Sequence, residues 1–155
     1  MTTFKQLQEN TNIHELIHAT FDVNLPISGK WGYTKTSPTV IEALPEGMTI
    51  IQLEHMLTSI RAHLEMNITQ EKTYRYAGIN TNEIAREQNK DTKDIIDKVI
   101  YKITAIQETL YNTFIKEYKD GYGEEAFDLS AHFKKREEST LIRNITHYFQ
   151  INKLA

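Results

Sequence analysis

The stretch from residue 91 to residue 119 constrains the fold more than any other part of the chain. Its apolar residues follow the spacing of one helix face: Ile95, Ile96, Val99, Ile100, Ile103, Ile106, Leu110 and Phe114. Asp91 or Thr92 can begin a helix, and Asp120-Gly121 can end it. At about 1.5 Å per residue, such a helix is on the order of 40 Å long. The pattern therefore predicts one long central helix that contacts several other elements.

A second helix is predicted over residues 49–67. Thr49 and Gln52 have the spacing of a capping box, in which each residue binds the backbone amide of the other. Apolar residues follow at a helical period: Ile50, Leu53, Met56, Leu57, Ile60 and Leu64. Residues 1–20 carry a weaker pattern, typical of two short helices, and residues 124–150 carry one typical of a broken helix or of two consecutive helices. Residues 68–90 lack an apolar stripe, so we expect a long connection there.

The apolar period changes to two between Phe21 and Ile27, which predicts a half-buried strand. Residues 31–33 and 40–41 indicate one or two further short strands. The expected fold is a single α+β domain over residues 1–155 that is mostly α-helical. In this prediction, a small N-terminal antiparallel sheet packs on a helical bundle with one long central helix.

Composition excludes several classes of protein. The chain has 155 residues and no cysteine, so disulfide scaffolds, cysteine zinc sites and thiol catalysis are excluded. Its formal net charge is −3, which gives no long-range attraction for nucleic acid or anionic lipid. No apolar leader opens the chain, and no apolar run has the length of a membrane span. We expect a cytoplasmic protein with no nucleic-acid or membrane partner.

One string matches a catalytic motif, since residues 14–18 read H-E-x-x-H. On a helix, His14 and His18 lie one turn apart and can bind a zinc ion. Glu15 can then act as the catalytic general base on a zinc-bound water. This spacing supports a metal-dependent hydrolase with zinc as cofactor.

The surroundings of the motif favour a structural interpretation instead. Asn24 stands where a major class of zinc proteases has its third histidine. A distant glutamate, Glu42 or Glu46, would have to replace it. Asn12 and Glu15 also have the capping-box spacing, which would engage Glu15 with the backbone. We therefore expect no cofactor, and the zinc hydrolase is the alternative.

The remaining functional signal in the sequence is a group of tyrosines, whose rings are apolar and whose hydroxyls can form hydrogen bonds. Tyr74 and Tyr76 flank Arg75 within the expected connection, and Tyr111 and Tyr118 lie at the margin of the predicted long helix. Aromatic and arginine side chains are enriched at protein interfaces. The sequence thus suggests a non-catalytic binding or assembly module that acts through protein–protein contacts, with a protein partner or as a homodimer. These five residues are its predicted interface.

Overall fold

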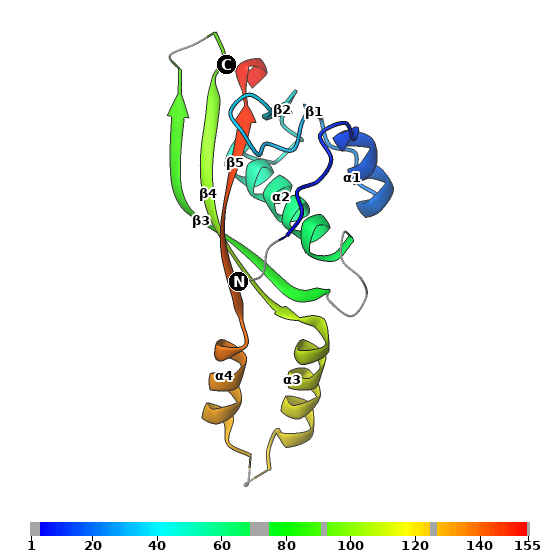
Figure 1. The fold of residues 1–155 in the computed structure, drawn as a ribbon, viewed down its shortest axis with the longest axis vertical. Coiled ribbons are helices and arrows are strands. Elements are labelled where there is room, and N and C mark those ends of the chain that lie inside the picture. The colour runs from blue at the N-terminus through cyan, green and yellow to red at the C-terminus, as the bar shows by residue number, and fades with distance from the viewer. Residues whose placement is uncertain (1–3, 69–74, 91–92, 125–126, 155) are drawn as a thin grey trace.

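The computed structural model describes residues 4–68, 75–90, 93–124 and 127–154, which form an α+β fold around one five-stranded mixed sheet (Figure 1). The strands are β1 (Ile27–Gly29), β2 (Thr39–Ile41), β3 (Tyr76–Asn89), β4 (Ile96–Gln107) and β5 (Leu141–Gln150). The helices are α1 (Ile13–Phe21), α2 (Ile50–His63), α3 (Glu108–Gly121) and α4 (Leu129–Glu138). A π-helical turn, η1 (Leu64–Ile68), follows α2, and a 3-10 turn, η3 (Asn152–Leu154), follows β5.

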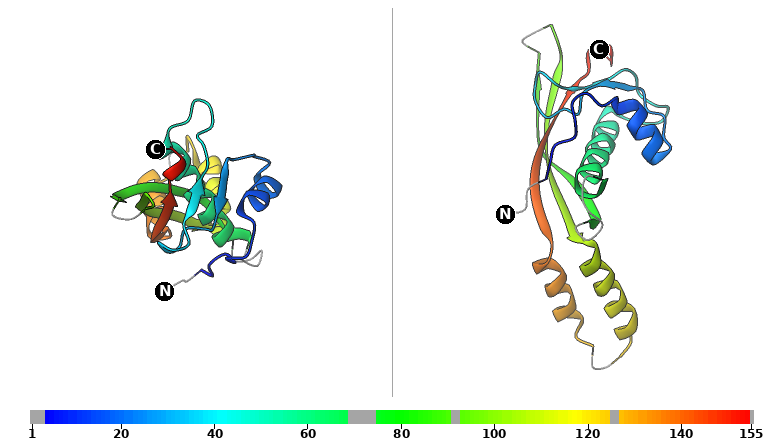
Figure 2. Two further views of the ribbon diagram at one scale, coloured as in Figure 1. Left: turned by 90° about the horizontal axis from the view of Figure 1, so that it is seen from above. Right: turned by 45° about the vertical axis from the view of Figure 1, so that its right-hand side comes forward.

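The strand order in the sheet is β1-β2-β5-β4-β3. The long strands β3, β4 and β5 are antiparallel neighbours, β2 runs parallel to β5, and β1 is antiparallel to β2. Helices α1 and α2 lie over the same face of the sheet (Figure 2). Helix α3 continues from β4, and α4 leads back into β5, so the two form a hairpin beyond the end of the sheet (Figure 1). Because β3 is the last strand in this order, it forms one edge of the sheet.

The core lies between α2 and the sheet. Leu53 and Leu57 of α2 are buried in one apolar cluster with alternate residues of β4, which are Val99, Tyr101, Ile103 and Ala105. Because side chains alternate along a strand, Lys98 and Lys102 are on the opposite face of β4. Helix α2 begins as predicted, since Thr49 and Gln52 form both bonds of the capping box.

The predicted bundle with a long central helix is wrong. Residues 96–107 are the central strand β4, and only residues 108–121 are helical, as α3. The strand has apolar residues on both faces, because Ile100 and Ile106 lie on the face opposite Val99 and Ile103. Apolar residues on both faces hide the two-residue period and imitate a helical stripe. The many β-branched residues of this segment were the contrary signal.

In two other segments, residues that were not predicted to be strands are also strands in the structure. The expected connection over residues 68–90 contains β3, which is polar because it is an edge strand and most of its residues are exposed. The expected helices of residues 124–150 are α4 followed by β5. Together with β4, these strands make the sheet large and central rather than small and N-terminal.

The N-terminal predictions hold in part. The segment that was expected to be a strand from Phe21 to Ile27 is the end of α1 and a loop, and β1 begins only at Ile27. Asp22 adopts a left-handed conformation, with φ of 56°, and its amide binds the carbonyl of His18, which ends α1. Strands β1 and β2 are antiparallel, as expected, but β2 joins them to β5. Among the described residues, no helix has both the length and the apolar character needed to cross a membrane.

Candidate functional site

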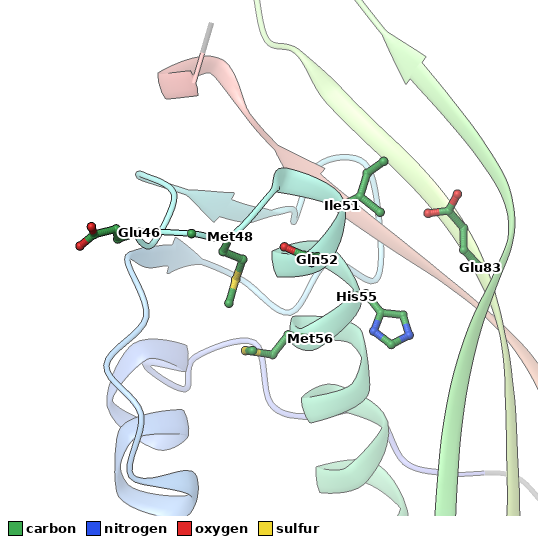
Figure 3. A pocket seen from close by; sticks show the side chains of 8 residues that line it. Glu46, Met48, Ile51, Gln52, His55, Met56 and Glu83 are labelled. Atoms are coloured by element: carbon green, nitrogen blue, oxygen red, sulfur yellow. The ribbon is translucent and has the colours of Figure 1, made fainter.

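A pocket of about 570 Å³ lies over the first half of α2 and the loop before it, and it reaches the edge strand β3 at Glu83 (Figure 3). Its apolar wall consists of Met48, Ile51 and Met56, and Glu83 of β3 lies across from His55. Ile51 is 52% exposed, an unusual position for a large apolar side chain. Methionine side chains are flexible and polarisable, so this wall can adapt to differently shaped apolar groups.

The sequence around the start of α2 builds the pocket wall. The amide of Met48 donates to the carbonyl of Pro45 at 3.1 Å, and Gly47 takes φ of 78° in this turn. The capping box at Thr49 then fixes the first turn of α2. Leu53 and Leu57 bind the helix to the core, which leaves the helix face of Ile51 and His55 at the pocket.

Strand β3 has one edge along which no described strand lies. It is the last strand of the sheet, and no other strand of the described residues pairs with its outer side. Its 14 residues make it longer than usual for a strand. Two register shifts, between Ala77 and Asn80 and between Glu83 and Ala85, interrupt its pairing with β4. Ile84 lies in the second shift and is 53% exposed.

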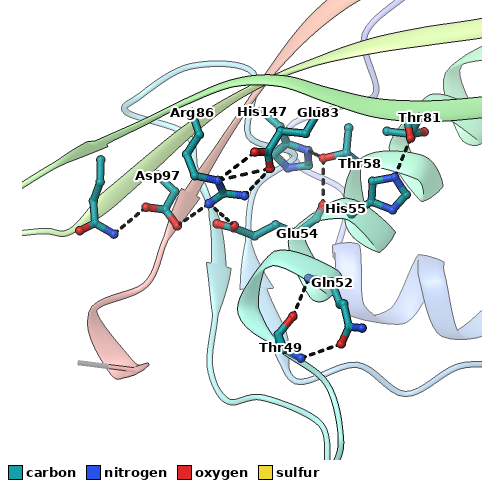
Figure 4. A network of polar contacts seen from close by, with 11 residues as sticks. Thr49, Gln52, Glu54, His55, Thr58, Thr81, Glu83, Arg86, Asp97 and His147 are labelled. Carbon is teal, nitrogen blue, oxygen red and sulfur yellow. Dashed lines mark hydrogen bonds and ion pairs between the residues drawn. The ribbon is translucent and has the colours of Figure 1, made fainter.

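A polar network ties the edge strand to α2 and β4 (Figure 4). The guanidinium of Arg86 lies 2.8 Å from the carboxylate of Glu54, 2.7 Å from that of Glu83 and 3.5 Å from that of Asp97. The Glu54 and Asp97 side chains are buried. Burial and the neighbouring Asp97 raise the pKa of Glu54 to about 8. Glu54 is therefore mostly protonated at neutral pH, which leaves fewer buried charges for Arg86 to balance.

Two histidines, His55 and His147, join further elements to α2. The His55 ring binds the carbonyl oxygen of Thr81 at 2.7 Å, so α2 is joined to β3 beside the pocket. Deeper in the core, the two ring nitrogens of His147 contact the hydroxyls of Thr39 and Thr58, both at 2.9 Å. Burial holds the pKa of His147 well below its usual value. A neutral imidazole that joins β2, β5 and α2 is structural, because it has no access to solvent.

The H-E-x-x-H residues 14–18 lie on helix α1, as the motif predicts. The rings of His14 and His18 stack with centroids 6.5 Å apart, and a ring nitrogen of His14 contacts the side-chain oxygen of Asn24 at 2.6 Å. The Asn12 side chain accepts a hydrogen bond from the amide of Glu15, which confirms Asn12 as the N-cap. Among the described residues, the return bond of the expected capping box, from the Glu15 side chain to the amide of Asn12, is not found. Within the described ranges, no three ligand-type side chains gather to hold a metal ion.

The predicted interface residues that the structure describes lie at the start of β3 and on α3. Tyr74 lies outside the described residues. The Tyr76 ring packs edge-on against Phe4 with centroids 5.5 Å apart, and its amide binds the side chain of Asn67. Arg75 and Tyr111 are half-buried, and Tyr118 lies in an aromatic cluster of the α3–α4 hairpin. These residues remain a prediction of an interface.

Comparisons with protein families, with curated proteins and with solved structures found no match to this chain. The pocket beside β3 was missed by sequence reasoning, because Met56 was assigned to the core and residues 68–90 to a connection. The short alternation of Ile79, Thr81 and Glu83 was the one available sign of a strand.

Proposed function

We propose that the protein is a non-catalytic binding module that takes up an extended segment of a partner protein along β3. The observation that carries this proposal is a long edge strand without a strand partner, placed beside an apolar pocket. A peptide that joins such an edge gains main-chain hydrogen bonds, and pockets for its side chains supply specificity.

The position of the pocket fits this mode of binding. Successive side chains of an added strand point to opposite faces of the sheet. Every second side chain would therefore lie on the α2 side of β3. Ile51 and His55 face β3 there, and the pocket continues over α2 to Met48 and Met56 (Figure 3). The regularly paired residues 80–83 and 85–89 are the parts of β3 suited to such pairing, since the register shifts lie outside them.

Charge narrows the chemistry of the partner. Two carboxylates, Glu46 and Glu83, line the pocket. Since Glu83 is already paired with Arg86 at 2.7 Å, the Glu46 carboxylate and the net charge of −3 are what favour a cation in the partner. A partner segment with one or two apolar side chains next to a lysine or arginine would complement this site. The rigidity of β3 also supports the proposal. The contacts of Arg86 with Glu54 and of His55 with Thr81 hold β3 and α2 together before a partner binds.

Selection from a library of displayed extended peptides tests the proposal. We expect the selected peptides to carry an apolar residue beside a cation, and to lose at least tenfold in affinity for Ile51→Glu. Ile142→Glu is the matched control, because Ile142 of β5 is 58% exposed and does not line the pocket. Selected peptides that bind wild type and Ile51→Glu equally would refute the proposal.

Light scattering distinguishes a second copy of the chain from a different partner. A wild type that dimerises, and an Ile51→Glu variant that does not, would mean that β3 takes up another copy instead of a foreign segment. That result would also support the homodimer expected from the sequence. A monomeric wild type that binds the selected peptides supports the proposal as stated.

A further inference from the structure

A second pocket, of about 240 Å³, lies where the N-terminal segment crosses β5 and the end of α2. Arg61 of α2 and Arg143 of β5 line it, together with Glu65, Tyr33, Phe4 and Gln6. Its residues are separate from those of the pocket beside β3, so it is independent of the function proposed above.

The charges of this pocket do not balance. Two guanidinium groups share one carboxylate, that of Glu65, which lies 3.0 Å from Arg143. Tyr33 adds no negative charge, because burial, and then the Glu65 carboxylate, raise its pKa above the usual value. Its hydroxyl donates to Glu65 and accepts from the amide of Leu7 at 2.9 Å. The side chains that line the pocket therefore carry one excess positive charge.

Because Arg61 is buried, the excess positive charge of the pocket has a high free-energy cost. It is 1% exposed, and its two terminal nitrogens donate to the carbonyl oxygens of Trp31, at 3.0 Å, and Thr146, at 2.8 Å. Both acceptors are neutral, and the Nε of Arg61 has no hydrogen-bond partner among the described residues. Arginine retains its proton in proteins, so a buried guanidinium needs an anion nearby.

Aromatic rings shape the pocket for a small ligand. The guanidinium of Arg143 lies 4.6 Å from the centroid of the Phe4 ring, and that of Arg61 lies 4.5 Å from the Tyr33 ring. These rings shield the cations from water and strengthen their attraction to an anion. The volume equals that of about eight waters at roughly 30 Å³ each, which is room for an ion such as phosphate or a small carboxylate together with several waters.

We infer that this pocket binds a small oxyanion, a phosphate or a carboxylate, between Arg143 and Gln6, with Arg61 behind it. The planar fork of an arginine matches two oxygens of either group. Gln6 is exposed at the pocket, where its amide can donate to a bound oxyanion. Glu65 competes with the ligand for Arg143.

Titration calorimetry with inorganic phosphate, and separately with acetate, tests this inference near neutral pH, with chloride keeping the ionic strength constant. Saturable binding of either anion is expected, and the arm that binds identifies the class of oxyanion. Arg143→Gln should bind about tenfold more weakly or not at all. Lys102→Gln is the control for bulk charge, because it removes a cation from the opposite face of β4 and should bind like wild type.

Glu65→Gln gives the most specific test. Glutamine keeps an oxygen that can accept from Tyr33 but removes the competing charge, so the anion should bind more tightly than to wild type. If Arg143→Gln does not fold, Gln6→Glu replaces it, because Gln6 is exposed and a carboxylate there should repel the ligand. The inference is overturned if neither anion binds the wild type, if Lys102→Gln weakens binding as much as the pocket variants, or if Glu65→Gln fails to strengthen it.

Discussion

Replacement of Glu54 by glutamine should change how the stability of the protein depends on pH. The Glu54 side chain is buried under the edge strand, where burial and Asp97 raise its pKa to about 8, against 4.5 for an ordinary glutamate. Between these two values, the folded chain retains a proton that the unfolded chain releases. The free energy of unfolding contributed by this group is therefore fully present below pH 4.5 and falls as the pH rises to about 8.

The size of the effect follows from the same two values. Each pH unit of difference corresponds to about 1.4 kcal/mol, so the full window amounts to at most about 5 kcal/mol. Local relaxation and entry of water would reduce this limit. Glutamine has nearly the same shape and never ionises. Relative to Glu54→Gln, the wild type should therefore lose several kcal/mol of stability as the pH rises from 5 to 8.

Urea unfolding followed by the fluorescence of Trp31, at intervals across this pH range, measures both proteins. The difference between the two curves isolates Glu54, because His147 is present in both. Glu87→Gln is the control, since it removes a carboxylate from the exposed part of the same edge strand. A difference between wild type and Glu54→Gln that does not change with pH would show that Glu54 is not protonated in the folded state.

Two more substitutions test local structure by chemical denaturation. Asn12→Ala removes the side chain that accepts from the amide of Glu15 and should cost about 1 kcal/mol; unchanged stability would contradict the N-cap. Gly32→Ala should cost at least about 2 kcal/mol more than Gly47→Ala. Both glycines have φ near 80°, but a Cβ at Gly32 would lie 2.2 Å from the His147 ring, whereas nothing lies within 4 Å of one at Gly47. Equal costs would mean that His147 can move aside.

Local signals made α2 and the start of α1 predictable. The capping box at Thr49 and the N-cap at Asn12 depend on residues three positions apart, so a single sequence contains all the information needed. The apolar stripe of α2 has one buried face, because only one side of the helix contacts the sheet. For both reasons, the spacing of residues in the sequence predicts these helices directly.

The sheet was not predictable in the same way, because its strands depend on distant neighbours. Residues 96–107 pair with both β3 and β5, so their conformation depends on segments that are distant in the sequence. This strand also has apolar residues on both faces, which removes the alternation. Strand β3 has the opposite difficulty. It has few buried residues, and its conformation is fixed by pairing with β4 rather than by its own apolar pattern.

The candidate sites depend on the same long-range pairing, which explains why the sequence did not indicate them. Glu54, Arg86 and Asp97 come from three separate elements, and no spacing along the chain relates them. Strand β3 is held by the hydrogen bond from Arg86 to the buried Glu54 and by the contact of His55 with Thr81. Such a strand cannot easily twist away from an incoming segment, so little ordering would be left to oppose association. The long-range contacts that a single sequence does not reveal are thus the ones that would hold β3 in place as a template for the proposed segment.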